Sequence, residues 1–184
     1  MTIYAATIVD TPGDPFDGDP ADALAAAGAL LVRDGVICAR GSFAELRAEH
    51  PDEPVIRLPG GMLIPGFIDT HVHFPQIRAI GGLGMPRLDW LQRCALPEES
   101  KLADQAYARE VASEFLDGLL ASGTTSALVF GSHFAAAMDE LFAAAEQRRL
   151  NITSGLVLSD RILRPDLLHS PQAALAESMD LIDR

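Results

Sequence analysis

Lysine, cysteine and tryptophan are scarce in this chain of 184 residues, which narrows the kinds of site it can build. The two cysteines, Cys38 and Cys94, lie far apart and have no second pair, so the sequence predicts neither a disulfide framework nor a four-thiolate zinc site. We expect both to be ordinary buried thiols. Lysine occurs once, at Lys101, and 14 basic residues stand against 26 acidic ones, for a net charge of −12. That charge repels a phosphate backbone and argues against nucleic acid as a partner.

Long hydrophobic runs are also missing. The longest apolar stretch, Ala23 to Val32, is about half as long as a membrane-spanning helix. The first twenty residues lack the basic start and clean apolar run of a signal peptide. We therefore predict a cytoplasmic protein without a membrane partner. The chain is also too short for a complete eight-stranded parallel barrel, which usually needs about 250 residues.

Short β-type runs separated by Pro, Gly and Asp clusters occupy residues 1–61, which we predict to be a β-rich subdomain forming a partial sandwich. The dipeptide Asp34-Gly35 stands between two apolar runs and is a strong hairpin signal. The runs expected to form strands are Ile3–Val9, Leu30–Arg33, Val36–Ala39 and Val55–Leu58.

From residue 62 onward the pattern changes to alternating strands and helices. A polar loop is expected to follow the first strand as far as Pro97, and Ser100 and Gly123 are expected to cap and end the first helix. This order predicts the α/β class, with parallel strands joined by helical crossovers. Residues 62–184 would hold three such units, too few to close a barrel. The expected strands are 62–68, 124–130 and 152–158, and the expected helices are 101–121, 135–148 and 171–184.

A His-x-His motif follows the first of these strands. Side chains alternate along a strand, so Asp69, His71 and His73 are expected to point the same way, at the carboxyl end where parallel-barrel enzymes place their chemistry. The two imidazoles can converge on one metal ion. Alone, such a motif is more often two solvated or hydrogen-bonded histidines, and catalytic zinc usually takes three or more protein ligands.

The run Leu63–His73 resembles the amidohydrolase superfamily, whose members carry His-x-His at the end of the first barrel strand. Further stretches resemble the guanine deaminase family within it, and the resemblance extends over residues 30–184. These stretches are Phe74-Pro75-Gln76, then Leu88-Asp89-Trp90-Leu91 with Pro97-Glu98 after it, and the segment 123–131.

This resemblance implies that residues 62–184 form the first three βα units of a (β/α)8 TIM-type barrel, an incomplete barrel. His71 and His73 would be two zinc ligands, and guanine would be hydrolysed to xanthine and ammonia by water that zinc activates. Gln76 would read the purine edge. Trp90 would cover the purine ring, although a core tryptophan fits its position nearly as well.

The resemblance also implies residues that this chain lacks. Two further histidines, a proton-shuttling glutamate and a metal-facing aspartate are expected beyond residue 184, so we expect the chain to be a part of a larger enzyme and inactive alone. The complete enzyme is expected to be a homodimer. His133 lies just after the second strand and could approach the site, whereas His50 and His169 are expected at the surface.

Two alternatives remain open. The chain could belong to an amidohydrolase with another substrate, such as an aminopurine, a pterin, a triazine or cytosine, because the zinc motif is shared and the pocket is not. A relative with two metals would need a carboxylated lysine, and Lys101, at the start of a predicted helix, is poorly placed for that. Alternatively, the chain could be a non-catalytic fragment that acts as a subunit.

Overall fold

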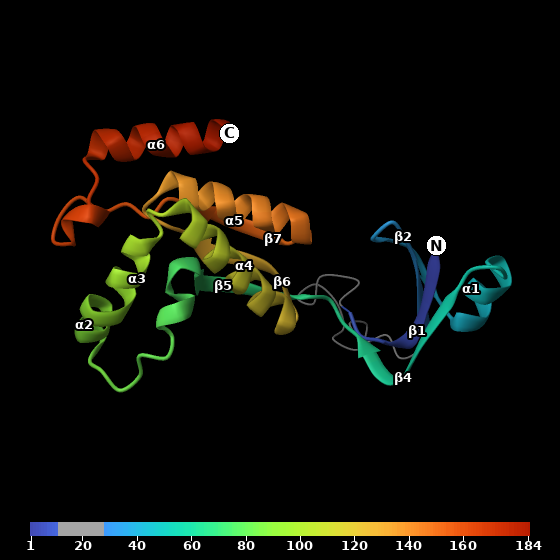
Figure 1. The fold of residues 1–184 in the computed structure, drawn as a ribbon. Coiled ribbons are helices and arrows are strands. Elements are labelled where there is room, and N and C mark those ends of the chain that lie inside the picture. Colours follow the sequence, from blue (N-terminus) through green and yellow to red (C-terminus); the bar gives the residue numbers. More distant parts are fainter. Residues whose placement is uncertain (11–27) are drawn as a thin grey trace, which may run out of the picture. The chain divides into compact units, whose positions relative to one another are not determined.

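The computed structural model describes residues 1–10 and 28–184, so the first half of the apolar run at 23–32 lies outside the described part. The chain divides into two compact units, Met1–Pro65 and Gly66–Arg184 (Figure 1). Within the described residues, no helix has the length and apolar character needed to cross a membrane.

The first unit is a four-stranded mixed sheet in the order β3-β2-β1-β4. Strand β1 pairs antiparallel with β2 and parallel with β4, and β2 pairs antiparallel with β3. The predicted hairpin is confirmed, since Asp34 and Gly35 both have positive φ, 50° and 80°, as a tight turn between β2 and β3 requires. The strands are β1 (Thr2–Ile8), β2 (Gly28–Arg33), β3 (Val36–Gly41) and β4 (Val55–Leu63).

A short helix that the sequence analysis missed, α1 (Phe43–Glu49), follows β3. The Ser42 hydroxyl accepts from the Glu45 N–H, and the Glu45 carboxylate accepts from the Ser42 N–H, which together make a capping box. Leu46, 4% exposed, anchors this helix on the sheet. One expectation is wrong here: Cys38 is exposed, because it lies at the register shift between β2 and β3 and its neighbour Ala39 is the residue that packs against the core.

The second unit contains a parallel sheet in the order β5-β6-β7, as the alternating pattern predicted. Helices α4 and α5 join these strands, pack against each other and cover one face of the sheet, and α6 follows (Figure 1). Ser170 caps α6 as expected, its hydroxyl accepting from the Ala173 N–H. The bounds are β5 (Phe67–His73), α4 (Gln105–Ala121), β6 (Thr124–Phe130), α5 (Ala135–Arg148), β7 (Asn151–Gly155) and α6 (Pro171–Asp183).

The first predicted strand of this unit, 62–68, is divided between two strands. Met62 and Leu63 end β4, and β5 begins only at Phe67, because the intervening Pro65 has no N–H to donate to a ladder. Gly66 then passes so close to β6 that a Cβ there would lie 1.9 Å from the Thr125 hydroxyl oxygen. The strand predicted at 152–158 is also shorter, since β7 ends at Gly155.

The connection from β5 to α4 is largely helical, not the expected loop. Ser100 lies inside α3 and donates to the Leu96 carbonyl, so it does not cap the next helix. Helix α4 begins at Gln105, after Asp104, whose carboxylate accepts from the Ala106 and Tyr107 N–H groups. The segments are the 3-10 helix η2 (Phe74–Ala79), α2 (Arg87–Trp90), the π-helical η3 (Leu91–Ala95) and α3 (Leu96–Lys101).

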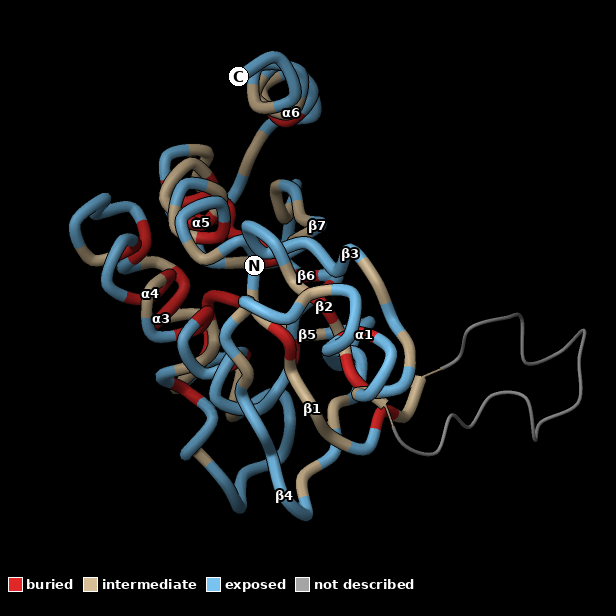
Figure 2. Tube along the Cα trace, turned by 90° about the vertical axis from the view of Figure 1, so that its right-hand side faces the viewer, coloured by how far each residue is buried: buried red, intermediate tan, exposed pale blue. Residues whose placement is uncertain are grey.

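The core of the second unit lies between the sheet and its helices (Figure 2). Alternation along β6 separates its two faces: Ala127 and Val129, each 4% exposed, pack under the helices. Leu128 and Phe130 point the other way and are 51% and 44% exposed. The face of the sheet opposite the helices therefore presents apolar side chains.

Candidate metal and substrate site

The two histidines of the His-x-His motif come together at the carboxyl end of β5. The ring centroids of His71 and His73 are 5.2 Å apart and the rings are inclined at 63°. Phe130, the last residue of β6, stacks on His73 with centroids 4.5 Å apart and an angle of 9°, and its ring lies 4.8 Å from that of His71. The two imidazoles thus gather around one phenyl ring.

Asp69 does not share the face of the two histidines. The register between β5 and β6 shifts between Asp69 and Val72, so an extra residue interrupts the predicted alternation. Asp69 pairs with Ala127, which is buried, whereas His73 pairs with Phe130 on the opposite face. The Asp69 carboxylate instead accepts from the backbone N–H of His71 at 3.0 Å and steadies the irregular part of the strand.

The histidine pair fits a metal ion. Two imidazoles bound to one tetrahedral zinc at roughly 2.0–2.1 Å place their ring centres about 5 Å apart, close to the separation of His71 and His73. Burial, and then the neighbouring His71, lower the pKa of His73, which favours the neutral imidazole that metal binding needs. Among residues 1–10 and 28–184, no group of three or more His, Cys, Asp or Glu side chains is arranged to hold a metal.

Gln76 lies in η2, directly after the histidines. The buried residues Phe74 and Pro75 anchor this short helix. The Gln76 amide nitrogen donates to the carboxylate of Glu99 in α3, with an Nε2–Oε1 distance of 2.8 Å. The sequence does not mark Glu99 as a site residue, because two acidic residues after Pro97 are typical of a solvent-exposed first turn of a helix.

Glu99 is 8% exposed and its second oxygen faces another buried group. Its Oε2 is 3.5 Å from Nδ1 of His133, which is 3% exposed. Burial raises the pKa of Glu99, against the lowering effect of the Gln76 hydrogen bond. Burial, and then His169, lower the pKa of His133. The structure therefore brings His133 to Glu99, and through it to Gln76, in one buried polar cluster.

Trp90 ends α2 and packs against the segment after η2. Its indole nitrogen donates to the Ala79 carbonyl at 3.2 Å, and a Cβ on Gly82 would lie 2.9 Å from the indole ring. These contacts fix the ring against residues 79–82. A substrate-covering role for Trp90 stays a prediction.

Two further residues differ from expectation. His169, expected at the surface, has a side chain only 12% exposed, and its ring lies parallel to that of His133 at 6.1 Å, because the segment after β7 folds back over the sheet end. Lys101 ends α3 instead of starting a helix, and its ammonium nitrogen is 2.6 Å from the Glu98 carboxylate. Lys101 therefore forms an ion pair within α3.

Comparison with known proteins identifies the protein family of this chain. Residues 62–173, more than half of the chain, match the Amidohydrolase family. This chain belongs to the amidohydrolase family. Members of the family are typically metal-dependent, in keeping with the paired imidazoles of His71 and His73. Residues 28–52 also match the imidazolonepropionase-like composite domain of bacteria.

The relatives of this amidohydrolase chain include guanine deaminases. A probable guanine deaminase from Deinococcus radiodurans is 55% identical over 189 residues, which span all of this chain and 43% of that protein. The solved structure of the Escherichia coli guanine deaminase is 31% identical with a TM-score of 0.88, over 100% of this chain and 44% of that one. The Bradyrhizobium japonicum guanine deaminase structure is 36% identical, with a TM-score of 0.86, over 99% and 40%. The chain thus spans less than half the length of these relatives.

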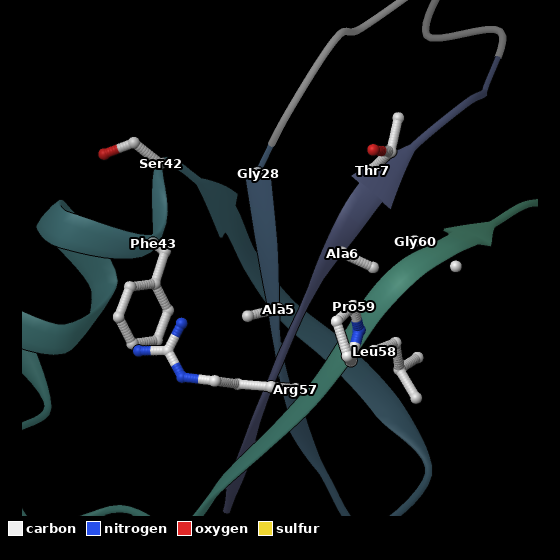
Figure 3. A pocket seen from close by; sticks show the side chains of 11 residues that line it. Ala5, Ala6, Thr7, Gly28, Ser42, Phe43, Arg57, Leu58, Pro59 and Gly60 are labelled. Carbon is white, nitrogen blue, oxygen red and sulfur yellow. The ribbon is translucent and has the colours of Figure 1, made fainter.

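The first unit of the amidohydrolase chain has a pocket of its own, between β1, β4 and the start of α1 (Figure 3). The guanidinium of Arg57 lies over the Phe43 ring, 4.1 Å from its centroid, a cation–π contact. Arg57 is the only charged side chain among the described residues lining this pocket. The described residues that line this pocket include no histidine, whereas His71 and His73 lie together at the end of β5.

Proposed function

We propose that these residues form part of a zinc-dependent guanine deaminase, a hydrolase that converts guanine to xanthine and ammonia. One observation carries the proposal: His71 and His73 converge at the carboxyl end of a parallel strand, in a chain 55% identical to a probable guanine deaminase. Parallel-barrel enzymes place their catalytic residues at that end of their strands.

We also propose that β5, β6 and β7 are the first three strands of a (β/α)8 barrel, preceded by the small β-rich unit. The exposed side chains Ile68, Leu128 and Phe130 support this, because apolar residues on the face opposite the helices are what a barrel interior buries. Three parallel strands leave such an interior open.

In this proposal each residue of the site has a distinct task. His71 and His73 hold zinc, which when bound lowers the pKa of water and so supplies a nucleophile near neutral pH. Gln76 reads the purine edge, because an amide can both donate and accept hydrogen bonds, as a base edge requires. Trp90, held against residues 79–82, covers the purine ring.

The proposed reaction also needs zinc ligands and a proton-shuttling residue that lie outside this chain. Catalytic zinc usually takes at least three protein ligands, and His71 and His73 provide two. We assign the remaining ligands, the proton-shuttling carboxylate and the dimer contacts to the portion of the relatives that this chain does not span. On this account, residues 1–184 alone bind zinc weakly and turn over no guanine.

A substrate panel tests the proposal. The full-length gene product is assayed with guanine, adenine, cytosine and a pterin, with ammonia and the deaminated base followed directly. We expect guanine to give xanthine with a kcat/KM of about 10⁴ M⁻¹ s⁻¹ or more. The other bases should be at least about 100-fold poorer, because they leave polar groups of the pocket unpaired. Preferential turnover of another heterocycle would indicate an amidohydrolase with a different substrate. A purified protein that contains no zinc and turns over none of these compounds would indicate a non-catalytic subunit.

A further inference from the structure

We propose that Glu99 is a positioning residue that fixes the orientation of the Gln76 amide. An amide has a donating end and an accepting end, and Gln76 turns its donating nitrogen to Glu99, with an Nε2–Oε1 distance of 2.8 Å. Its carbonyl oxygen is thereby directed to the substrate, to accept from a purine N–H. This inference rests on the proposed function, because it takes Gln76 as the residue that reads the base.

The flipped amide is disfavoured by simple electrostatics. If Gln76 turned by 180°, its carbonyl oxygen would face the oxygen of Glu99, and neither oxygen would receive a hydrogen bond. Glu99 is 8% exposed, so water cannot readily compensate for that loss. An ionised Glu99 can only accept, and a neutral Glu99 keeps Oε1 as an acceptor when its proton lies on Oε2, the oxygen that faces Nδ1 of His133. The orientation of the amide is thus fixed, because only its nitrogen end can donate a hydrogen bond to Glu99.

Glu99 is itself held from its other side. Its Oε2 lies 3.5 Å from Nδ1 of His133, and Nε2 of that ring lies 3.4 Å from the Ser159 hydroxyl oxygen. His133 follows β6 and Ser159 follows β7, whereas Gln76 follows β5. Gln76 and His133 therefore reach the Glu99 carboxylate directly, and Ser159 is connected to it through His133. A site built this way is rigid, and rigidity is what a recognition amide needs to discriminate between bases.

The neighbouring Glu98 provides a matched control. It is 9% exposed, in the same helix, and of the same chemistry as Glu99. Its carboxylate accepts instead from the Lys101 ammonium at 2.6 Å and from the Tyr107 hydroxyl. Loss of Glu98 therefore disturbs the same helix without touching the hydrogen bond to Gln76.

A double-mutant cycle in the full-length gene product tests the inference. We expect Glu99→Leu and Gln76→Leu each to raise the KM for guanine by about 10-fold or more, because each removes a hydrogen bond to a charged or recognition group. The double variant should match Gln76→Leu alone, since Glu99 acts only through Gln76. Glu99→Gln, which keeps an accepting oxygen, should restore most of the affinity. Zinc content should stay unchanged throughout, and Glu98→Leu should alter KM by less than about 3-fold.

Two results would overturn the inference in an active enzyme: additive effects of Glu99→Leu and Gln76→Leu, or an equal rise in KM for Glu98→Leu. A separate measurement decides the matter even if the wild-type protein does not deaminate guanine. One of the two side-chain N–H protons of Gln76 should exchange slowly with solvent by NMR, and Glu99→Leu, but not Glu98→Leu, should remove that protection. Fast exchange of both protons in the wild-type protein contradicts the inference, whereas absent guanine turnover alone contradicts the proposed function.

Discussion

Glu98 and Glu99 are adjacent in α3 and both largely buried, yet their pKa values are displaced in opposite directions. For Glu99, burial dominates and raises the pKa. For Glu98, burial also acts to raise the pKa, but hydrogen bonds from Lys101 and Tyr107 outweigh it and leave the pKa below its ordinary value of 4.5. Two neighbouring carboxyl groups should therefore make opposite contributions to stability as pH changes.

The free energy of unfolding should show this difference. A raised pKa means that the contribution of Glu99 is fully present below pH 4.5 and is lost as pH rises through the raised pKa. Glu99→Gln should therefore gain stability relative to the wild type as pH increases above 4.5. The measurement is urea unfolding at a series of pH values, followed by the fluorescence of Trp90, the single tryptophan.

Glu98→Gln is the control for that experiment, with the opposite sign. Its lowered pKa means that the contribution of Glu98 is present above pH 4.5 and is lost as pH falls through the lowered pKa. The wild type should therefore exceed Glu98→Gln in stability above pH 4.5, and the difference should shrink in acid. Parallel pH profiles for the two variants would refute the assignment of these pKa directions.

The start of α4 offers a second prediction, on stability. Asp104→Ala removes the acceptor for the Ala106 and Tyr107 N–H groups and should cost about 1 kcal/mol. Ser100→Ala is the matched control, because Ser100 only donates back to the Leu96 carbonyl within α3. It should change the free energy of unfolding by less than about 0.5 kcal/mol. An equal loss in both variants, measured by urea unfolding, would mean that Asp104 does not cap the helix.

The uncovered face of the parallel sheet should make the 184-residue chain self-associate. Ile68 and Leu128 on that face are 71% and 51% exposed, and burying each such side chain contributes about 1.5–3 kcal/mol. The double variant Ile68→Gln/Leu128→Gln should weaken association by about 100-fold or more in sedimentation equilibrium. Ile162→Gln, in the loop after β7 and 96% exposed, is the control and should leave association unchanged. A wild-type chain that remains monomeric at high micromolar concentration would contradict this prediction.

Local sequence signals predicted much of the second unit. Strand β6 and helix α5 begin and end where the pattern placed them, because Gly123, with φ +80°, separates α4 from β6 and a simple periodicity follows. The start of α4 was misplaced, because both Ser100 and Asp104 are good capping residues and only the intervening turn decides between them. Helix α1 was missed, although Ser42 and Glu45 form a recognisable capping box, because its seven residues show little apolar periodicity.

The site was predictable only where it is local in sequence. His71 and His73 are two residues apart on one strand, so strand geometry brings them together whatever the rest of the fold does. The hydrogen bond between Gln76 and Glu99 joins residues 23 positions apart, across a helical connection for which the sequence pattern predicts a loop. The shifted register that separates Asp69 from the histidines depends on pairing with β6, which no single-strand pattern contains.

We propose that His71 and His73 hold the zinc on which guanine hydrolysis depends. His71→Ala and His73→Ala, made in the full-length gene product, should each lower the bound zinc well below one equivalent. Both should lower kcat/KM for xanthine formation by more than about 100-fold, since even the loss of an outer-sphere partner of a metal ligand costs 10–100-fold. His50→Ala, in the first unit at the end of α1, is the matched control and should keep wild-type zinc content and activity.

The most direct measurement is therefore zinc content and xanthine formation on the same preparations of wild-type, His71→Ala and His73→Ala protein. We expect about one zinc per wild-type chain with guanine turnover, and the parallel loss of both in each histidine variant. Full zinc content with undiminished xanthine formation in either histidine variant would contradict it.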